Sequence, residues 1–527
     1  MFKILSKDGF VLACCSLAAL LALSHSYAGF QQPQLDLLIR RGKVIDGSGS
    51  GPVIADVGVK GDRIVFIGDA AREKVGAART IDAAGLVVAP GFVDPHTHTM
   101  EDLSDPDRKS NENYLMQGVT TVITGNDGGG PARVRDTLDR WQRQGIGTNA
   151  ALLVGQGAVR RQVMAMSDAE PSPAQLERMK GMISRAMDEG AFGMSTGLYY
   201  APGSYAKTEE VIELAKAAAL KGGVYDSHMR DESSYSIGLL GSIKETIRIG
   251  REANIPVNIS HIKALGTDVW GKSVDAINLI NKARAGGVKV TADQYPYTAS
   301  GTSVTAALVP RWAEVGGEAE LLKRIEDALT RPRLIAEMEA NLKRRGGAES
   351  LLITSARDRA LVGKTLGQVA GERARSPIEA ALEIIKAGGA GVASFNMDEK
   401  DVENFMKQDF VMTGSDGSDG HPRKYGTFPR KLREYVYRKK VISLAFAVRH
   451  SSALACETFR IPERGLIRRG YYADLIVFDE KGVADRATYE QPRLLAAGMK
   501  YVIVNGKLAV DGGRYTGALA GRPLRKK

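Results

Sequence analysis

Apolar runs alternate with amphipathic stretches through the middle of the chain. Short apolar runs bounded by glycine or polar residues are typical of buried strands, and stretches with apolar residues on one face are typical of helices. Repeated alternation of the two favours a parallel sheet, either a closed barrel or a doubly wound sheet. We predict strands at 120–124, 150–154, 190–194, 223–225, 257–260, 288–291 and 410–413, and helices at 174–187, 209–221 and 242–253 among others.

The segments on either side of this region contain short predicted strands separated by glycine turns. Before it, we predict strands at 35–40, 43–46 and 62–68, and after it at 472–479 and 502–507. We expect the two ends to fold together into one small β-sandwich domain made of residues 34–90 and 457–525. Residues 91–456 then form the second domain.

The alternation is interrupted between about residues 311 and 393 by charged helices, predicted at 321–329 and 334–345. Strand–helix alternation resumes near Ala393. We therefore interpret residues 311–393 as an insertion into the second domain, either a lid or a small subdomain.

The first 28 residues have the pattern of a secretory signal peptide. Lys3 and Lys7 precede an apolar stretch at 10–23, and Ser26-Tyr27-Ala28 fits a small-x-small cleavage site. The apolar stretch is short for a membrane span, although an uncleaved anchor is the alternative. We expect an exported protein, periplasmic or secreted. Cys456 is the one cysteine beyond this segment, so no intramolecular disulfide is expected.

Composition excludes few functions. The net charge of +11 comes from 72 basic and 61 acidic residues that are spread along the chain, without a basic arm or a nucleic-acid motif. We therefore expect no nucleic-acid partner. No other segment is long and apolar enough to span a bilayer, so we expect no membrane association after signal cleavage. The charge has a modest attraction for anions. The oligomeric state is not readable from the sequence.

An H-x-H motif, His96 and His98, follows the apolar run 86–89, in a chain with seven histidines. Alternate side chains of an extended strand point the same way, so the two imidazoles would lie side by side as ligands for one metal ion. The alternative is that two histidines fall close together in a loop without binding a metal.

Four further polar residues follow predicted strands: Asp127, His228, His261 and Asp416. Active sites of parallel barrels are assembled from residues at these strand ends. Taken singly, each aspartate can be an ordinary turn residue and each histidine a structural one. Together with the H-x-H pair they indicate a metal site, in which a carboxylate can bind the metal and exchange a proton with an activated water molecule.

These motifs resemble those of the amidohydrolase superfamily and, within it, the D-aminoacylase (N-acyl-D-amino-acid deacylase) family. The resemblance covers nearly the whole chain after the N-terminal segment. It rests on Pro-Gly-Phe-Val-Asp-x-His-x-His at 90–98, Gly-Val-Thr-Thr at 118–121, Asp-x-Tyr-Pro-Tyr at 293–297, Gly-Ser-Asp-Gly at 414–417 and the ending at 465–475. More specific to the family are Ser-Thr-Gly-Leu at 195–198 and His-Pro-Arg-x-Tyr-Gly-Thr-Phe-Pro-Arg at 421–430.

The resemblance implies a fold and a set of roles. The fold is a distorted (β/α)8 TIM-like barrel with a small β-sandwich domain from both chain ends. The metal ligands are His96, His98, Asp127, His228, His261 and Asp416, with Asp416 also the catalytic proton shuttle. The substrate would be a small molecule whose α-carboxylate meets Lys263, Tyr200, Tyr295 and Ser300, and Arg423 would also bind the substrate. The cofactor is a divalent metal, most consistent with Zn²⁺, with one or two ions per subunit; Mn²⁺ and Co²⁺ are alternatives.

This chain departs from the family pattern at two positions, Asp127 and Gln156. Asp127 stands where the family usually has a cysteine, and there is no lysine near 193–195, where many amidohydrolases have a carboxylated bridging lysine. We therefore hypothesise that the two oxygens of Asp127 bridge two metal ions and make the site less selective for zinc than a thiolate would. Gln156 replaces a histidine common in relatives and cannot supply a positive charge.

We expect hydrolysis of a linear amide, in which an N-acyl-D-amino acid or a D-containing dipeptide yields a carboxylate and a D-amino acid. The D preference comes from the resemblance alone. A cyclic amidase of the dihydroorotase or hydantoinase type is the nearest alternative enzyme. A non-catalytic scaffold with the same barrel is the alternative of another class.

Overall fold

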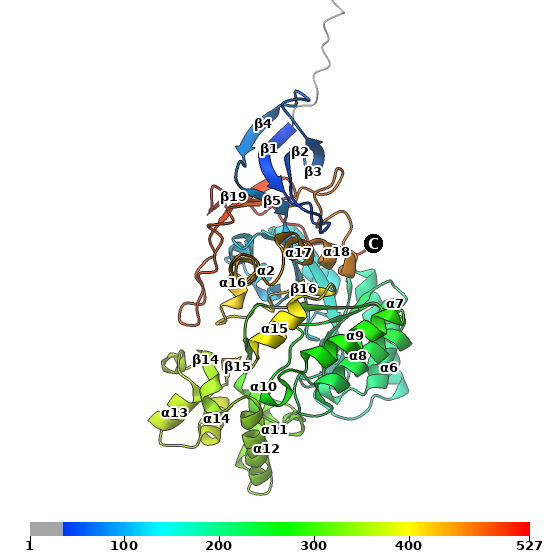
Figure 1. The fold of residues 1–527 in the computed structure, drawn as a ribbon. Helices are drawn as coiled ribbons and strands as arrows, with labels where there is room; N and C mark the ends of the chain where they lie inside the picture. Colours follow the sequence, from blue (N-terminus) through cyan, green and yellow to red (C-terminus); the bar gives the residue numbers. More distant parts are fainter. Residues whose placement is uncertain (1–34) are drawn as a thin grey trace, which may run out of the picture.

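The computed structural model describes residues 35–527, so the predicted signal peptide lies outside the described residues. The described chain forms a barrel, a β domain that joins both of its ends, and an insertion made of helices and a small sheet (Figure 1). No helix between residues 35 and 527 is long and apolar enough to cross a membrane.

Eight parallel strands form the barrel, in the order β16-β12-β11-β10-β9-β8-β7-β6. One bridge, between Thr97 of β6 and Gly417 in the loop after β16, joins the two edges of the sheet, so the barrel is nearly closed. The barrel, one of the two folds that the alternating pattern favoured and the one that the resemblance implied, is therefore confirmed. The strands are β6 Phe92–Thr97, β7 Val119–Thr124, β8 Asn149–Gly155, β9 Gly193–Gly197, β10 Val224–His228, β11 Val257–Ile259, β12 Val290–Gln294 and β16 Val411–Thr413.

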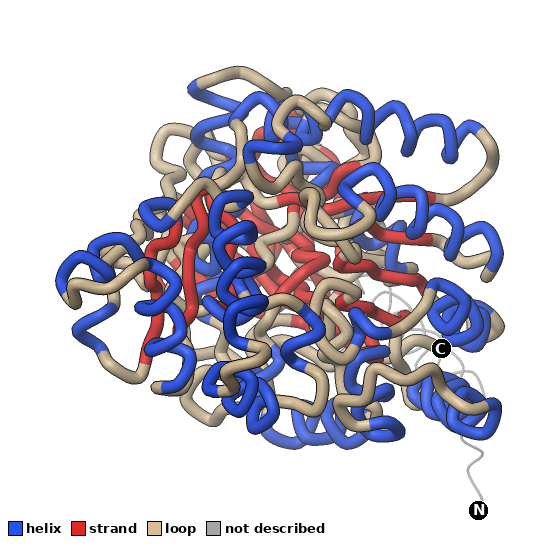
Figure 2. The backbone as a smooth tube through the Cα atoms, turned by 90° about the horizontal axis from the view of Figure 1, so that it is seen from below, coloured by secondary structure: helices blue, strands red, loops and turns tan. Residues whose placement is uncertain are grey.

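Helices lie around the barrel strands (Figure 2). Those between β6 and β12 are α2 Met100–Ser104, α3 Glu112–Leu115, α4 Val134–Gln144, α5 Gln156–Met164, α6 Pro173–Asp188, α7 Thr208–Ala219, α8 Gly238–Glu252 and α9 Ser273–Ala285, with short 3₁₀ turns η1 Gly203–Tyr205 and η2 Thr267–Val269. The helices that flank β16 are α15 Glu399–Met406, α16 Arg423–Arg430, the π-helix η6 Lys431–Arg438, α17 Leu444–His450 and α18 Ala453–Phe459.

Alternation along the barrel strands divides the core into two layers. On β7, Val122 packs in the large cluster that includes helix residues such as Leu138, while its neighbour Ile123 packs in a separate cluster. That second cluster also contains Leu153 of β8 and Phe459 of α18. Successive side chains of a strand point to opposite faces, so both faces of β7 and β8 are buried against apolar clusters, as the near-continuous apolar runs predicted.

The two ends of the described chain share one nine-stranded sheet, in which β1 Leu35–Val44, β2, β3, β4 and β5 come from the beginning and β17 to β20 from the end. The other bounds are β2 Val53–Lys60, β3 Arg63–Gly68, β4 Ala77–Asp82, β5 Val87–Pro90, β17 Leu475–Phe478, β18 Met499–Val504, β19 Lys507–Asp511 and β20 Arg514–Tyr515. β5 pairs with β1 on one side and with β17 on the other, which joins the two halves.

One strand prediction in this sheet was wrong. Residues 35–40 and 43–46 were expected to be two strands separated by a glycine turn, but β1 runs through from Leu35 to Val44 with a register shift between Ile39 and Gly42. The irregularity lies at Arg41, whose φ is 59° and whose backbone N–H donates to the Asp56 carboxylate at 2.7 Å. A bulge resembles a turn in sequence because both use a residue with positive φ.

Gly91 separates the two sheets. β5 ends at Pro90 in the end sheet and β6 begins at Phe92 in the barrel. A Cβ atom on Gly91 would lie 2.2 Å from Oγ1 and 2.3 Å from Cγ2 of Thr120 on β7, so only glycine fits at this close approach. The short connection places the H-x-H motif at the far end of β6.

The insertion has a sheet and a core of its own. Strand β13 Ala299–Ser303 pairs with β15 Ala390–Phe395, which pairs with β14 Leu351–Ala356, all antiparallel. A separate apolar cluster from Val304 to Val392 packs there. Its helices are α10 Val304–Leu308, α11 Glu318–Glu326, α12 Arg331–Arg344, α13 Leu366–Glu372 and α14 Pro377–Lys386, with 3₁₀ turns η3 Arg311–Glu314, η4 Ala348–Ser350 and η5 Arg359–Leu361. The sheet thus extends slightly beyond the predicted interval 311–393. The prediction that the barrel's strand–helix alternation resumes near Ala393 was wrong, because β15 pairs with β13 and β14 and not with a barrel strand.

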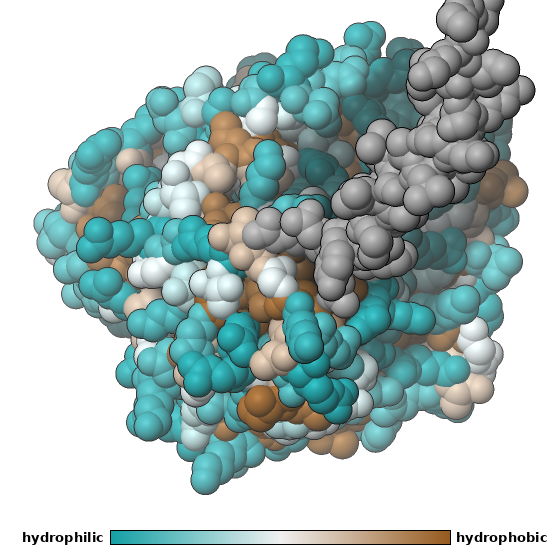
Figure 3. Space-filling view, turned by 90° about the horizontal axis from the view of Figure 1, so that it is seen from above, coloured by the Kyte–Doolittle hydropathy of each residue, from teal (hydrophilic) through white to brown (hydrophobic). Residues whose placement is uncertain are grey.

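The outer surface is ordinary for a globular protein. On the face seen in Figure 3 hydrophilic residues predominate, and apolar residues form only small patches. Scattered exposed apolar residues of this kind need no functional explanation.

Candidate metal centre and substrate pocket

The six predicted metal ligands come together at the C-terminal ends of five barrel strands. His96 and His98 lie at the end of β6, Asp127 after β7, His228 at the end of β10, His261 after β11 and Asp416 after β16. Three of them, Asp127, His261 and Asp416, have positive φ values of 55°, 35° and 47°. Left-handed backbone is uncommon for residues other than glycine and concentrates at functional sites, where the surrounding structure holds it.

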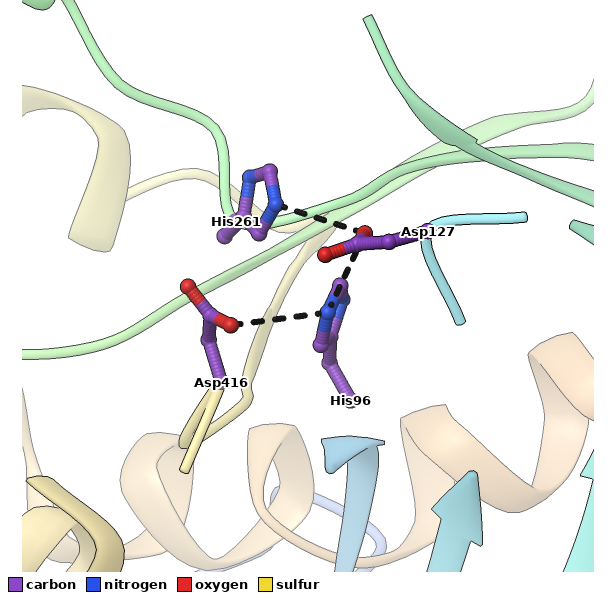
Figure 4. Close-up of side chains that lie close together, drawn as sticks. All are labelled: His96, Asp127, His261 and Asp416. Carbon is purple, nitrogen blue, oxygen red and sulfur yellow. Dashed lines mark ion pairs between the residues drawn. The ribbon is translucent and has the colours of Figure 1, made fainter. Parts of the chain in front are cut away.

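Asp127 lies at the centre of the group. Its carboxylate oxygens lie 3.4 Å from His96 Nε2, 3.5 Å from His98 Nε2, 3.5 Å from His228 Nδ1 and 3.6 Å from His261 Nε2. Figure 4 shows the Asp127 carboxylate between the His96 and His261 rings, with Asp416 facing His96. One carboxylate within reach of four imidazoles is the arrangement that a bridging ligand requires.

Asp416 directs one carboxylate oxygen at the histidines and the other at the guanidinium of Arg423. Its Oδ1 lies 2.9 Å from His98 Nε2 and 3.7 Å from His96 Nε2, and its Oδ2 lies 2.9 Å from Arg423 Nη1. Burial raises the pKa of Asp416, but the charges of Arg423 and His261 lower it more, so the net shift is well downwards. The carboxylate is therefore held ionised and in a fixed orientation.

Buried carboxylates hold the backbone of the ligand residues. Asp94 Oδ1 accepts hydrogen bonds from the backbone N–H of His96 at 3.2 Å and of Ser415 at 3.0 Å, which ties the end of β6 to the loop after β16. Asp293 Oδ1 accepts the backbone N–H of His261 at 3.0 Å. Burial raises the pKa of Asp94 to about 7, against the effect of these hydrogen bonds.

Ser195 on β9 fixes the loop that carries Asp127. Its hydroxyl donates to the carbonyl oxygen of Gly125 at 2.5 Å and accepts the backbone N–H of Gly128 at 3.1 Å. The Ser-Thr-Gly-Leu motif therefore acts on the metal site through the neighbouring loop. Sequence reasoning assigned this motif no role.

The donor set fits a divalent metal. His96, Asp127, His261 and Asp416 offer ligand atoms within 4.8 Å of one another, and His228, Glu232 and His261 form a second such group. Both ring nitrogens of His96, Nδ1 of His228 and Oδ1 of Asp127 are buried without a hydrogen-bond partner, which is costly unless a further group binds there. Imidazole and carboxylate ligands suit zinc, and a carboxylate also suits manganese.

The electrostatic field at the site favours a cation. Burial lowers the pKa of His96, but the carboxylates of Asp127, Asp293 and Asp416 raise it to about 10. Burial raises the pKa of Asp127, whereas the charges of His96 and His228 bring it well below its ordinary value. The carboxylates thus stabilise positive charge at the histidines, as they would stabilise a metal ion.

Glu232 was not predicted, and it contacts a ligand directly. Its Oε1 lies 3.0 Å from His261 Nδ1 and 2.6 Å from Lys263 Nζ, and Lys263 Nζ lies 2.7 Å from the same Nδ1. Burial raises the pKa of Glu232, but the charges of Lys263 and His261 lower it more, so this carboxylate is ionised. A carboxylate behind a ligating histidine orients the ring and increases its basicity.

Replacing Glu232 with glutamine is expected to weaken metal binding about 10–100-fold, because the His261 ring loses its charged partner. Competition with a graded chelator, followed by metal analysis, measures the change. Glu403→Gln on α15 removes another carboxylate that pairs with a lysine, Lys439, and should leave metal affinity unchanged. Equal metal affinity in Glu232→Gln and the parent would contradict a positioning role.

A pocket of about 410 Å³ opens over the metal-binding group. All five predicted substrate-binding residues line it: Tyr200, Lys263, Tyr295, Ser300 and Arg423. Tyr295 is buried and its hydroxyl has no hydrogen-bond partner, and Arg423 Nε is also unpartnered. Lys263 instead pairs with Glu232, and Ser300 Oγ lies 3.4 Å from Asn396 Oδ1. Tyr295 and Arg423 therefore hold the free donors on the Asp416 side of the pocket.

The insertion forms one wall of this pocket. Its lining residues there are Arg345, Thr354, Ser355, Gly391 and Val392. Tyr199 and Tyr235 line the pocket from barrel loops. None of these residues was predicted, because only the folded chain brings the insertion over the barrel.

Gln156, the second departure from the family pattern, does not line the pocket. It is fully buried at the start of α5, and its Nε2 donates to Glu210 at 3.3 Å, beside the Glu210–Arg160 ion pair. Its contacts are those of a structural residue.

A parallel barrel with histidine and aspartate ligands at the C-terminal ends of its strands defines a metal-dependent hydrolase. Comparison with known proteins makes this more specific. A model of the amidohydrolase family matches residues 79–510. The D-aminoacylase of Alcaligenes xylosoxydans xylosoxydans is 35% identical over 93% of this chain and 98% of its own length.

Comparison with solved structures also finds similarity to D-amino-acid deacylases. A crystal structure of a D-aminoacylase has a TM-score of 0.80 and 35% identity, covering 93% of this chain and 100% of its own. The N-acyl-D-glutamate deacylase from Bordetella bronchiseptica, complexed with zinc and a phosphonate inhibitor, has a TM-score of 0.79 and 31% identity, covering 94% and 100%. The chain belongs to the amidohydrolase family, and the predicted resemblance to D-aminoacylases is confirmed.

Proposed function

We propose that this protein is a zinc-dependent deacylase that hydrolyses the linear amide of N-acyl-D-amino acids to a carboxylate and a D-amino acid. The observation that carries the proposal is the group of six ligands around Asp127 below a pocket with free donors, in a chain 35% identical to a D-aminoacylase. A bound divalent metal supplies a Lewis acid for the acyl oxygen and activates the attacking water.

Residues of this chain transfer the proton and hold the substrate. Arg423 holds Asp416 Oδ2, which leaves Oδ1 directed at the ligand histidines. From this position Asp416 accepts a proton from the attacking water and returns it to the leaving nitrogen. Free donors on Tyr295 and Arg423 bind the α-carboxylate and so fix the amide over the metal-binding group.

Asp127 supports a further part of the proposal, a two-metal site. Its two oxygens together reach imidazoles of both ligand groups, His96 and His98 on one side and His228 and His261 on the other. Because a carboxylate is a harder ligand than a thiolate, we propose that manganese and cobalt also support activity.

The test is a screen of enzyme loaded with zinc, manganese or cobalt. N-acetyl-D-amino acids, their L enantiomers, D-containing dipeptides and cyclic amides such as hydantoins are compared. The proposal expects turnover of the linear D substrates. Turnover confined to cyclic amides would assign a cyclic amidase instead, and a metal-loaded protein inactive on every class would point to a non-catalytic scaffold.

We also propose export to the periplasm or the medium, which is supported by the signal-like segment at residues 1–28. Sequencing the N-terminus of the protein recovered from these fractions tests it. A start near Gly29 is expected. An intact Met1 in the cytoplasmic fraction would contradict the proposal.

A further inference from the structure

Arg345 is a buried cation on the wall of the pocket. It follows the last residue of α12 in the insertion, its side chain is buried, and it is one of the pocket-lining residues. Among residues 35–527 four arginines are buried: Arg160, Arg345, Arg423 and Arg464.

Arg345 differs from the other three in its partners. Arg160 pairs with Glu210 at 3.2 Å, Arg423 with Asp416 at 2.9 Å, and Arg464 with Asp474. In the described part of the chain no carboxylate oxygen lies within 4.0 Å of the Arg345 guanidinium, and its Nε and Nη1 have no hydrogen-bond partner. Within residues 35–527, the side chain of Arg345 makes one hydrogen bond, in which Nη2 donates to the Tyr199 hydroxyl at 3.3 Å.

A buried guanidinium without a counter-charge is costly, and arginine cannot escape the cost by losing its proton. The C-terminus of α12 and the Tyr235 ring, 5.8 Å away, offset part of the charge. Neither of them accepts the hydrogen bonds of Nε and Nη1. An anion in the pocket would do so, and a carboxylate matches the planar fork of arginine.

The two arginines that line the pocket contact different residues around the metal-binding group. Arg423 contacts Asp416 and lies 4.6 Å above the Tyr295 ring. Arg345 contacts Tyr199, whose ring stacks on the His228 ring at 5.9 Å. The two guanidinium groups therefore have different partners, and each has a donor without a hydrogen-bond partner. The pocket thus offers two places where an anion can bind.

Resting on the proposed function, we propose that Arg345 binds a second carboxylate of the substrate, besides the α-carboxylate. The substrates are then N-acyl-D-amino acids with two carboxylates. The second carboxylate belongs either to an acidic side chain or to a dicarboxylic acyl group such as succinyl. Arg345 is a specificity-determining residue for the reaction.

Matched substrates test this with the full-length, metal-loaded enzyme. N-acetyl-D-glutamate is compared with the neutral N-acetyl-D-glutamine, and N-succinyl-D-leucine with N-butyryl-D-leucine. We expect at least about tenfold higher kcat/KM for the charged member of one pair, as a charged hydrogen-bonded contact provides. The pair that shows the preference identifies the source of the carboxylate. Equal values within both pairs would overturn the proposal.

Substitutions at Arg345 and at the adjacent Arg344 test whether Arg345 causes the preference for the charged substrate. Arg345→Met is expected to abolish the preference by lowering kcat/KM for the charged substrate about 10–100-fold with less than about threefold change for its neutral partner. Arg345→Lys should restore part of it. Arg344→Gln, at the adjacent residue that does not line the pocket, should retain the preference. Equal losses on charged and neutral substrates in Arg345→Met would assign Arg345 to the α-carboxylate or to folding, and would overturn the proposal.

A binding measurement separates this inference from the proposed function. Calorimetry with D-glutamate, D-glutamine and N-succinyl-glycine, used as free ligands, needs no turnover. Binding of a dicarboxylate that is lost in Arg345→Met supports the anion site even if no N-acyl-D-amino acid is cleaved. Turnover of D substrates without any Arg345-dependent discrimination upholds the deacylase and overturns the second site.

Discussion

Replacing Asp416 with asparagine is expected to lower kcat about 10²–10⁴-fold, because the side chain loses the ability to accept and return a proton. The amide has nearly the same shape and keeps an oxygen for Arg423, which lies 2.9 Å from the carboxylate. The fold should therefore remain intact. Steady-state kinetics, with thermal unfolding and metal content measured on the same preparation, check the result.

Asp409→Asn is the matched control for this change. Asp409 makes an exposed ion pair with Arg284 before β16, away from the pocket. Loss of a surface pair of this kind has little effect. Full activity of Asp416→Asn would remove the proposed proton shuttle. Activity lost in proportion to metal content would reassign Asp416 as a ligand only.

Replacing Asp127 with alanine is expected to have the largest effect on metal binding. Among residues 35–527 this carboxylate is the one group within 3.6 Å of all four candidate ligand histidines, so its loss leaves no bridging oxygen between them. We expect the metal content to fall by at least one ion per chain and the affinity for the remaining ion to fall more than about 100-fold. This loss is larger than the loss expected from replacing a residue that only orients a ligand. Atomic emission after dialysis against defined metal buffers measures both.

Asp127→Cys separates bridging from simple ligation. A thiolate is a softer ligand, so this variant should retain zinc and lose part of its manganese binding relative to the parent. Unchanged metal content in Asp127→Ala would contradict a bridging role. An identical order of metal preference in the parent and in Asp127→Cys would contradict the proposed relaxed selectivity.

Much of the barrel was predictable from the sequence because its strands are buried on both faces and contain short apolar runs. The positions of the candidate ligands were predictable because a polar residue at the end of such a strand lies at one rim of a parallel barrel. His228, the last residue of β10, and Asp416, after β16, show this most simply.

What was missed depends on contacts between distant segments. Glu232 is one of several polar residues after β10, and only the approach of His261 at 3.0 Å gives it a role. Arg345 lies in a charged helical segment whose other arginines are half-buried or exposed, so its burial follows from how the insertion packs over the barrel. The continuous β1 was missed because the bulge near Arg41 uses the same positive φ as a turn.

We propose that a metal site with Asp127 at its centre hydrolyses linear N-acyl-D-amino acids. The most direct measurement is kcat/KM for paired D and L enantiomers of N-acyl-amino acids, made on one preparation whose metal content per chain is known. We predict turnover of the D enantiomers, dependence on bound metal, and at least about 100-fold preference over the L forms. Equal rates for both enantiomers, or activity that persists after complete metal removal, would contradict the account.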